Sequence, residues 1–455
     1  MFFKRNIDAT QGNLLKLIFY YSIPLILTTL AQDFFTITDK AVLGNMAGST
    51  AVACIGATSS IITLIINGAV GLSTGVSIVL ARFVGEKSQK EIRVTIDTAL
   101  LTGFFIGLLV AIIGNLLSPL FLSITNCPAE CYDGALLYLR IYISGSPFTL
   151  FYNYGAAVLR TLGDTRRPLF YILVSGLVNV CLNIVLCLIL TQKVAAVAIA
   201  TITAKIISSL LVAIRFTKLE NETKVVFKNM HFNKEIFGKI LKLGIPVSVS
   251  SLTFPLANLQ ILSAVNTFGV NAIAGNSAAQ SIISIPYAFA DGFGNATAIF
   301  MGQNIGARNP DRVKSSFWYS LFINILISGS LGIIMYFTGT FWLRLILGAG
   351  ETEAVKYGMV RLFYVILFMF IYATNKTLTS ALQAFGYPFL TSTTNIFFTL
   401  GFRIVWMQII YRIFSTFKMI MACFTISWSL NLLFYTICFG VIYWRYVKKG
   451  ICKKI

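Results

Sequence analysis

A segment near the start of the chain recurs about halfway along it, and this internal repeat constrains the fold more than any other feature. The positions that recur are Pro24 as Pro246 and, after a one-residue adjustment, Gly48 as Gly269, Gly71 as Gly292, and Gly85 as Gly306. Matches between Leu and Ile carry little weight in an apolar chain, but glycine and proline rarely stay in register by chance over about sixty residues. The repeat predicts two halves built on one plan.

Composition shows what kind of protein is duplicated. Of the 455 residues, 57% are hydrophobic and only 11% are charged, whereas about a quarter of the residues of a water-soluble domain are charged. Apolar runs of about 20 residues or more can cross a bilayer. They lie at 17–42, 51–80, 95–121, 141–158, 168–190, 194–214, 243–266, 272–301, 315–343, 362–382, 389–411 and 419–444. These runs predict an all-α membrane protein with 12 transmembrane helices in two six-helix lobes.

The longest polar connection lies between the two halves. We therefore predict an N-terminal lobe at 1–220, a cytoplasmic basic linker at 221–238 and a C-terminal lobe at 239–455. The linker region holds the only histidine, His231, among several lysines, and its composition is that of a solvated segment that also contacts anionic lipid headgroups. One histidine builds neither a zinc site nor a Ser-His-Asp relay. We expect no enzyme activity, no cofactor and no metal site.

The basic residues predict the orientation. If the N-terminus is cytoplasmic, the even-numbered connections and the two tails carry 25 of the 36 Lys and Arg residues. This bias predicts a multi-pass protein of a cell membrane with both termini in the cytoplasm. The net charge of +20 is therefore a topology signal, and the chain has no soluble basic domain of the kind that binds nucleic acid.

Two smaller motifs have structural interpretations. Gly71-Leu-Ser-Thr-Gly75 lies in an apolar run, where small residues four apart let helices approach closely. Cys127 and Cys131 flank a short outer segment, and the sequence is compatible with free thiols or with a strained disulfide.

Charged residues inside the predicted spans are the best candidates for function, because such groups are costly in a membrane and usually face a cavity or a partner. The acids well inside spans are Asp33, Asp39 and Asp291. Gln32 and Thr36 share a helix face with Asp39, while Asp33 shares another face with Lys40. The deep basic residues are Lys205, Lys376 and Arg403. All of these are candidates for lining a cavity or for pairing with one another.

Several strings resemble the multidrug and toxic compound extrusion (MATE) family. The most specific are Val158-Leu-Arg-Thr-Leu-Gly-Asp-Thr-Arg-Arg-Pro168 and Gly302-Gln-Asn-Ile-Gly-Ala307; others are Ile23-Pro24, Thr38-Asp-Lys-Ala-Val-Leu-Gly44, Gly71 to Gly75, Ala81-Arg-Phe-Val-Gly85 and Leu182-Asn-Ile-Val-Leu186. Together with the repeat, these strings cover nearly the whole chain. The resemblance implies a V-shaped pair of lobes that opens alternately to each side and exports amphipathic organic compounds in exchange for protons or sodium ions.

The resemblance also implies an ion-coupling cluster in the N-terminal lobe. Asp39 matches the carboxylate of the first helix, and Asn183 and Thr201 match the asparagine of the fifth helix and the threonine of the sixth. Cys187 stands where the family has a second acid. A thiol in place of a carboxylate, with Lys205 one turn beyond Thr201, makes a poorer sodium site. We therefore expect coupling to protons rather than to sodium.

A second interpretation is a flippase of a lipid-linked saccharide or another lipid-linked precursor. Anionic headgroups need deep cations, and Lys40, Lys205, Lys376 and Arg403 are candidates for that role. Both interpretations require a small-molecule or lipid substrate and a bilayer.

The predicted orientation can be checked by cysteine labelling. Cysteines introduced at Lys90 and Arg308 should react only from the cytoplasmic side, and cysteines at Glu130 and Glu351 should react from outside, because the Lys and Arg bias places the connections in this way. Labelling of position 90 from outside intact cells would contradict the predicted topology.

Overall fold

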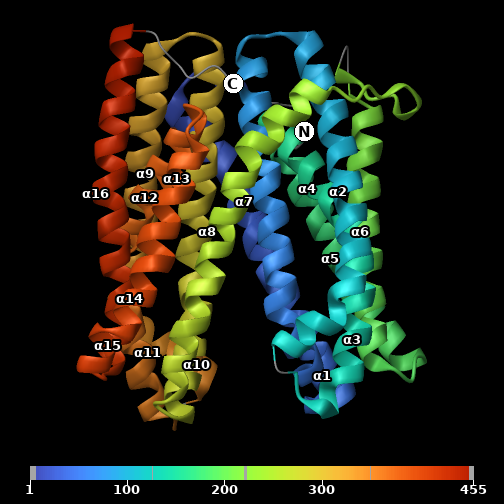
Figure 1. Cartoon of the computed structure of the whole chain (residues 1–455), viewed down its shortest axis with the longest axis vertical. Coiled ribbons are helices and arrows are strands. Elements are labelled where there is room, and N and C mark those ends of the chain that lie inside the picture. The colour runs from blue at the N-terminus through green and yellow to red at the C-terminus, as the bar shows by residue number, and fades with distance from the viewer. Residues whose placement is uncertain (1–6, 126, 220–222, 349, 450–455) are drawn as a thin grey trace. The chain divides into compact units, whose positions relative to one another are not determined.

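The structure is a computed structural model that describes residues 7–125, 127–219, 223–348 and 350–449. The described residues form helices joined by short connections, and no strand occurs among them (Figure 1). The chain divides into two compact units. The first unit consists of Leu27–Ser248 with the described residues up to Asp8, and the second consists of Ala9–Ile26 with the described residues from Val249 onward.

The predicted membrane character is confirmed by long apolar helices. Nine helical segments in the described chain are long and apolar enough to cross a bilayer: Leu14–Met46, Cys54–Gly85, Gln89–Ile124, Arg166–Ile189, Lys193–Thr217, Lys234–Asn266, Pro310–Phe337, Pro388–Ile413 and Phe417–Tyr446. A pair of helices bent by 44°, Thr352–Val365 and Met369–Ala384, makes up to ten. The run predicted at 141–158 is divided at Gly145 between two helices, and the run at 272–301 lies in a long but less apolar helix. The count of twelve stays a prediction.

The first unit contains most of the N-terminal half of the chain. Its elements are α1 (Leu14–Gly85), from Leu27 onward, α2 (Gln89–Ile124), α3 (Ala129–Ser144), α4 (Ser146–Thr161), α5 (Arg166–Ile189), α6 (Lys193–Thr217), the short 3-10 helix η2 (Phe227–Asn229) and the start of α7 (Lys234–Asn266). Helix α2 packs on α3 and α4, α5 packs on α6, and α6 also contacts α3 and α4.

The second unit contains most of the C-terminal half. Its elements are the rest of α7, α8 (Val270–Gly306), α9 (Pro310–Phe337), α10 (Gly339–Leu347), α11 (Thr352–Val365), α12 (Met369–Ala384), α13 (Pro388–Asn395), the π-helical turn η3 (Ile396–Gly401), α14 (Phe402–Gln408), α15 (Ile410–Ile413) and α16 (Phe417–Lys449). Helix α8 lies at its centre and packs on α9, α11 and α12, while α16 covers α11 and α12.

The two units exchange the beginnings of their first helices. The start of α1 belongs to the second unit, where Tyr21 packs edge-on against Phe300 with ring centroids 5.4 Å apart. The start of α7 belongs to the first unit, where the Ser248 hydroxyl donates to the Gly68 carbonyl at 2.9 Å. Because Pro24 and Pro246 are equivalent in the repeat, the exchange involves equivalent segments of both halves.

The segments that lead into these helices are bound in the same reciprocal manner. Before α1, the Ala9 amide donates to Gln303 Oε1 at 3.1 Å, and Asn304 Nδ2 donates to the Ala9 carbonyl at 3.1 Å. Before α7, the Asn233 amide donates to Thr98 Oγ1 at 3.1 Å. Gln303 and Asn304 of the Gly-Gln-Asn motif at 302–304 therefore bind the segment that precedes α1.

The other specific string forms the turn between α4 and α5. Gly163 has φ +87°, a conformation that costs other residues energy. Asp164 then begins α5 by accepting a hydrogen bond from the Arg167 amide at 3.2 Å, and its carboxylate pairs with the side chain of Arg167. This string has a structural role in the described chain.

Gly75 is the position where small size matters most in α1. A Cβ atom at this residue would lie 2.5 Å from the Ile240 carbonyl oxygen and 2.7 Å from the Gly244 nitrogen, both on α7. Backbone atoms cannot move aside as a flexible side chain can. The close approach that the glycine spacing predicted is therefore present at Gly75.

We predict that Gly75→Ala destabilises the protein and that Gly56→Ala does not. The added methyl group at 75 overlaps the α7 backbone, and overpacking of this kind costs about 1–3 kcal/mol. Gly56 lies in the same helix with no atom within 4 Å of an added Cβ, so alanine there should be neutral or stabilising. The measurement is the thermal unfolding midpoint in detergent. An unchanged or higher midpoint for Gly75→Ala would contradict the close contact.

Candidate functional site

Asp39 lies between two helices of the first unit, held by two amide side chains. On α5, Asn183 Nδ2 donates to Asp39 Oδ1 at 2.6 Å. The Asn179 side-chain amide is satisfied when its nitrogen faces the carboxylate. In this orientation the nitrogen lies 2.6 Å from Asp39 Oδ1 and 3.3 Å from Oδ2. Asn179 and Asn183 are four residues apart, so both project from one face of α5 toward α1. The carboxylate is therefore satisfied by neutral donors.

Other polar groups surround this carboxylate at a greater distance. Lys205 of α6 is close enough to attract Asp39 electrostatically, although the two do not form an ion pair within 4.0 Å in the described structure. Tyr138 and Tyr142 of α3, whose rings stack with centroids 6.1 Å apart, also interact electrostatically with Asp39. Helices α1, α3, α5 and α6 all contribute to the site.

Two residues of the predicted ion-coupling cluster, Thr201 and Cys187, make no described contact with Asp39 or Asn183. The Thr201 hydroxyl donates to the Val197 carbonyl of its own helix at 2.9 Å. Cys187 is buried in an apolar cluster with Leu43 and Tyr138, and its thiol lies 4.0 Å from the Lys193 carbonyl. Asp39 and Asn183 are thus brought together, while the described contacts of Thr201 and Cys187 do not involve them.

The other candidates on α1 are exposed in the first unit. Gln32, Asp33 and Thr36 lie on its surface, and the Thr36 hydroxyl donates to the Gln32 carbonyl at 2.9 Å. The side chain of Lys40 lies outside the described residues, so its pairing with Asp33 stays a prediction.

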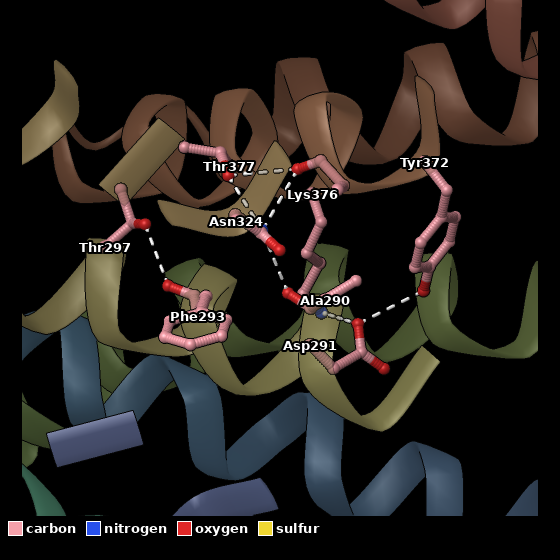
Figure 2. A network of polar contacts seen from close by, with 9 residues as sticks. Ala290, Asp291, Phe293, Thr297, Asn324, Tyr372, Lys376 and Thr377 are labelled. Carbon is pink, nitrogen blue, oxygen red and sulfur yellow. Dashed lines mark hydrogen bonds and ion pairs between the residues drawn. The ribbon is translucent and has the colours of Figure 1, made fainter. Parts of the chain in front are cut away.

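Asp291 of α8 is at the centre of a second charged cluster, in the second unit (Figure 2). Lys376 Nζ lies 3.1 Å from Asp291 Oδ1, and the Tyr372 hydroxyl donates to the same oxygen at 3.1 Å. Both donors come from α12 and lie four residues apart. The aliphatic part of Lys376 packs against Gly294, where a larger residue would collide with it. Here a deep acid and a deep base neutralise each other.

A buried asparagine holds the helices around this ion pair (Figure 2). Asn324 of α9 donates to the Ala290 carbonyl of α8 at 3.1 Å, and to the Ala373 carbonyl and the Thr377 hydroxyl of α12 at 3.2 and 3.0 Å. These bonds connect α8, α9 and α12. They fix the two backbones from which Asp291 and Lys376 project.

Arg403, the last deep basic residue, is buried in the second unit with 1% of its surface exposed. Its Nε and Nη2 atoms each lie 3.2 Å from Ser427 Oγ, and its guanidinium lies over the Phe424 ring, 4.3 Å from the centroid. Unlike Lys376, it forms no ion pair in the described structure.

The family model MatE matches residues 24–185 and 246–409, once in each half of the chain. The chain belongs to the MatE family. The two matches fall on the two copies of the internal repeat, so the repeat and the family assignment support each other.

Bacterial relatives cover most of the chain. It is 26% identical over 392 residues to the probable multidrug resistance protein YoeA of Bacillus subtilis, with 84% of each chain covered. It is 28% identical over 382 residues to the probable multidrug resistance protein YpnP of the same organism, covering 83% of this chain and 84% of YpnP. It is 25% identical over 309 residues to an FAD transporter of Shewanella oneidensis, covering 66% of this chain and 67% of that transporter. MatE proteins are membrane transporters of small molecules, and this chain is one of them.

Solved structures show the same fold. A crystal structure of MATE in the bent conformation superposes with a TM-score of 0.87 at 20% identity, covering 97% of this chain and 99% of the other. A transporter from Pyrococcus furiosus, described as having a binding pocket of reverse polarity, superposes with a TM-score of 0.85 at 20% identity, covering 96% and 99%. The two-lobe architecture predicted from the repeat is confirmed.

The structure adds residues that the sequence analysis did not select. Asn179 is four residues before Asn183. This spacing places both side chains on one face of a helix, and it is the signal in the sequence that points to Asn179. Tyr372 stands one turn before Lys376, but tyrosine is common in this chain and carried no special signal. Arg361 lies one residue before the apolar run at 362–382, a position typical of a connection, yet it is 5% exposed within α11.

The contacts of Asp291 and Lys376 predict that the two side chains stabilise the protein as a pair. Asp291→Asn and Lys376→Met should each lower the thermal midpoint, because each leaves a charge without its partner. The double variant should lose less than the sum, with a coupling of about 0.5–1 kcal/mol, the modest value reflecting side chains that are partly exposed.

The exposed pair of Glu353 and Lys356, 2.7 Å apart, is the matched control. The same double-mutant cycle on Glu353→Gln and Lys356→Met should give a coupling near zero. Equal coupling energies for the two pairs would contradict the prediction, because they would show that partial burial does not strengthen the Asp291–Lys376 interaction.

Proposed function

We propose that this protein is a secondary antiporter that exports amphipathic organic compounds from the cytoplasm in exchange for protons. Membership in the MatE family and relatives described as probable multidrug resistance proteins support export of such compounds. The observation that carries the coupling mechanism is the position of Asp39, a carboxylate on a membrane-spanning segment whose hydrogen-bond donors are two neutral amides. The proposed setting is a cell membrane with both termini in the cytoplasm, as the Lys and Arg bias predicts.

The geometry around Asp39 gives protonation a mechanical consequence. As a carboxylate, Asp39 accepts hydrogen bonds from Asn179 and Asn183. A protonated carboxyl group has one oxygen that donates instead of accepting. Oδ1 accepts from both amides at 2.6 Å and can keep them, so a proton on Oδ2 opposes the 3.3 Å contact with Asn179 and removes the attraction of Lys205 for the site. Protonation would thus change how α1 packs on α5, and a ligand can shift a two-state equilibrium through such differential contacts.

The surroundings of Asp39 favour a proton over a sodium ion. Sodium is a hard cation that needs several oxygen ligands. Cys187 offers a buried thiol in place of an oxygen ligand, and Lys205 repels cations near the carboxylate. A proton needs only one oxygen of Asp39. These contacts support proton coupling with a small contribution from sodium.

The alternative function, a flippase of a lipid-linked precursor, rested on deep cations. In the described structure Lys376 is neutralised by Asp291, and Lys205 lies in the field of Asp39. Two of the four cations are thus engaged by acids of the protein itself. Arg403 keeps its charge without an acidic partner in the described structure, so the preference for the exporter is supported by the family and by the relatives.

We predict that Asp39→Asn abolishes proton-driven efflux. The amide preserves the size of the side chain but cannot take up and release a proton. In sodium-free proteoliposomes with a pH gradient, export of a cationic amphipathic dye such as ethidium should fall to the level of liposomes without protein. Wild-type protein should transport under the same conditions, and added sodium should change its rate little.

Asp133→Asn is the matched control, since Asp133 is an exposed acid of α3 in the same unit. It should transport at the wild-type rate. Proton-driven export by a well-expressed Asp39→Asn protein would remove Asp39 from its role. An absolute requirement of the wild type for sodium would overturn proton coupling.

A further inference from the structure

The interior of the second unit contains two arginines that lack an acidic partner. Arg403 is 1% exposed and Arg361 is 5% exposed. Guanidinium groups stay protonated even when buried, so both carry charge. The ion pairs of the described residues include neither of them. Two buried positive charges are therefore held by neutral groups alone.

These two charges lie close together. Both guanidinium groups approach the ring of Phe424, with the Cζ of Arg403 at 4.3 Å and that of Arg361 at 5.7 Å from its centroid, and they repel each other electrostatically. Arg361 bonds to the side-chain oxygens of Asn276 and Gln280 on α8, and Arg403 bonds to Ser427 on α16. The contacts with the rings and neutral oxygens reduce the cost of burial but leave the net charge of the pair in place.

Three hydrogen-bond donors in this region have no partner among the described residues. They are Arg403 Nη1, Arg361 Nε and the Tyr287 hydroxyl, all of them buried. Tyr287 interacts electrostatically with both arginines, so the three donors belong to one cluster. They come from α14, α11 and α8. Buried donors are almost always satisfied in proteins, and three of them around two positive charges indicate a site for an anion.

The local backbone also has a feature typical of functional sites. Arg403 stands two residues after the π-helical turn η3 (Ile396–Gly401), and π turns within helices occur frequently at such sites. Helix α16 contacts both parts of this segment: Ser427 bonds to Arg403, and Asn431 donates to Thr399 of the π turn at 3.1 Å.

We infer that Arg361, Arg403 and Tyr287 bind the carboxylate or phosphate group of an aromatic compound that the protein transports. Each guanidinium has one open donor atom, so the two arginines would hold the anion with one charge-assisted hydrogen bond from each and a third hydrogen bond from the Tyr287 hydroxyl. Aromatic rings line the same region: Phe254 lies 5.5 Å from Arg403, and Tyr287 packs against Tyr372 and Trp428. Flat faces of this kind suit a ring system attached to the anion. The inference rests on the proposed export of amphipathic compounds and names a chemical group that the substrates carry.

The test compares a rhodamine dye that carries a free carboxylate with its methyl ester, measured by fluorescence polarisation on the purified full-length protein in nanodiscs. Wild-type protein should bind the carboxylate dye at least roughly tenfold more tightly than the ester. The ester has no negative charge, so it leaves the buried guanidinium groups without an anionic partner. Arg403→Gln and Arg361→Gln should each abolish this preference. Arg403→Lys, which keeps the charge but not the planar guanidinium, should retain part of it.

Arg344→Gln is the matched control, because Arg344 is an exposed arginine of α10 in the same unit. It should keep the full preference for the carboxylate. Equal binding of the dye and its ester by the wild-type protein would overturn the inference, and this result does not depend on whether any variant folds.

A second measurement distinguishes a substrate from a free inorganic ion. Inorganic phosphate and chloride are added at constant ionic strength, and the thermal midpoint of the wild-type protein is followed. Phosphate should compete with the carboxylate dye for binding. Stabilisation by phosphate or chloride without such competition would show that the ligand is a free ion and would overturn the assignment to a substrate. Failure of either test while ethidium export continues would reject the anion site and leave the proposed antiporter intact.

Discussion

The cost of a charge away from water governs the arrangement of both units. The interior of this protein meets that cost in three ways. Asp39 is held by amide donors from one face of α5, Asp291 is neutralised by Lys376, and the arginines are held by neutral oxygens and aromatic faces. Only the second arrangement is a direct ion pair. Asp39 is attracted by Lys205 without a direct ionic contact, whereas the arginines keep a net charge that a mobile ion can neutralise, and this separates candidate binding groups from structural ones.

Much of the fold could be predicted from the sequence because lipid imposes simple rules. A backbone in hydrocarbon must satisfy its own hydrogen bonds, so each long apolar run had to be a helix. The run at 141–158 departs from one continuous helix, because it is divided at Gly145 between α3 and α4. The run at 272–301 is helical as predicted, within α8.

The candidate site was predictable only in part, because a motif fixes position along the chain but not the direction of a side chain. Asp39 and Asn183 meet as the resemblance implied. Thr201 instead bonds to its own helix, and Cys187 enters an apolar cluster. The burial of Arg361 could not be predicted, because an arginine at the end of an apolar run has the same sequence pattern as the start of a connection. The exchange of helix starts between the units could not be read from chain order, since the repeat shows which segments are equivalent but not which unit each one joins.

The two halves have kept their packing and diverged in charge. The glycines and prolines of the repeat remain in register, and one contact shows why: Gly292, the counterpart of Gly71, lies against Ile26 in the second unit, where an added Cβ would overlap that side chain. The charges are not in register. Asp291 corresponds to Val70, and the segment of α7 equivalent to the surroundings of Asp39 carries Gln260 and Ile261. An acid without an ionic partner lies in one unit, and two arginines without one lie in the other. Duplication supplied two equivalent frameworks, so the proposed proton site in the first unit and the inferred anion site in the second could evolve without disturbing the contacts that hold each unit together.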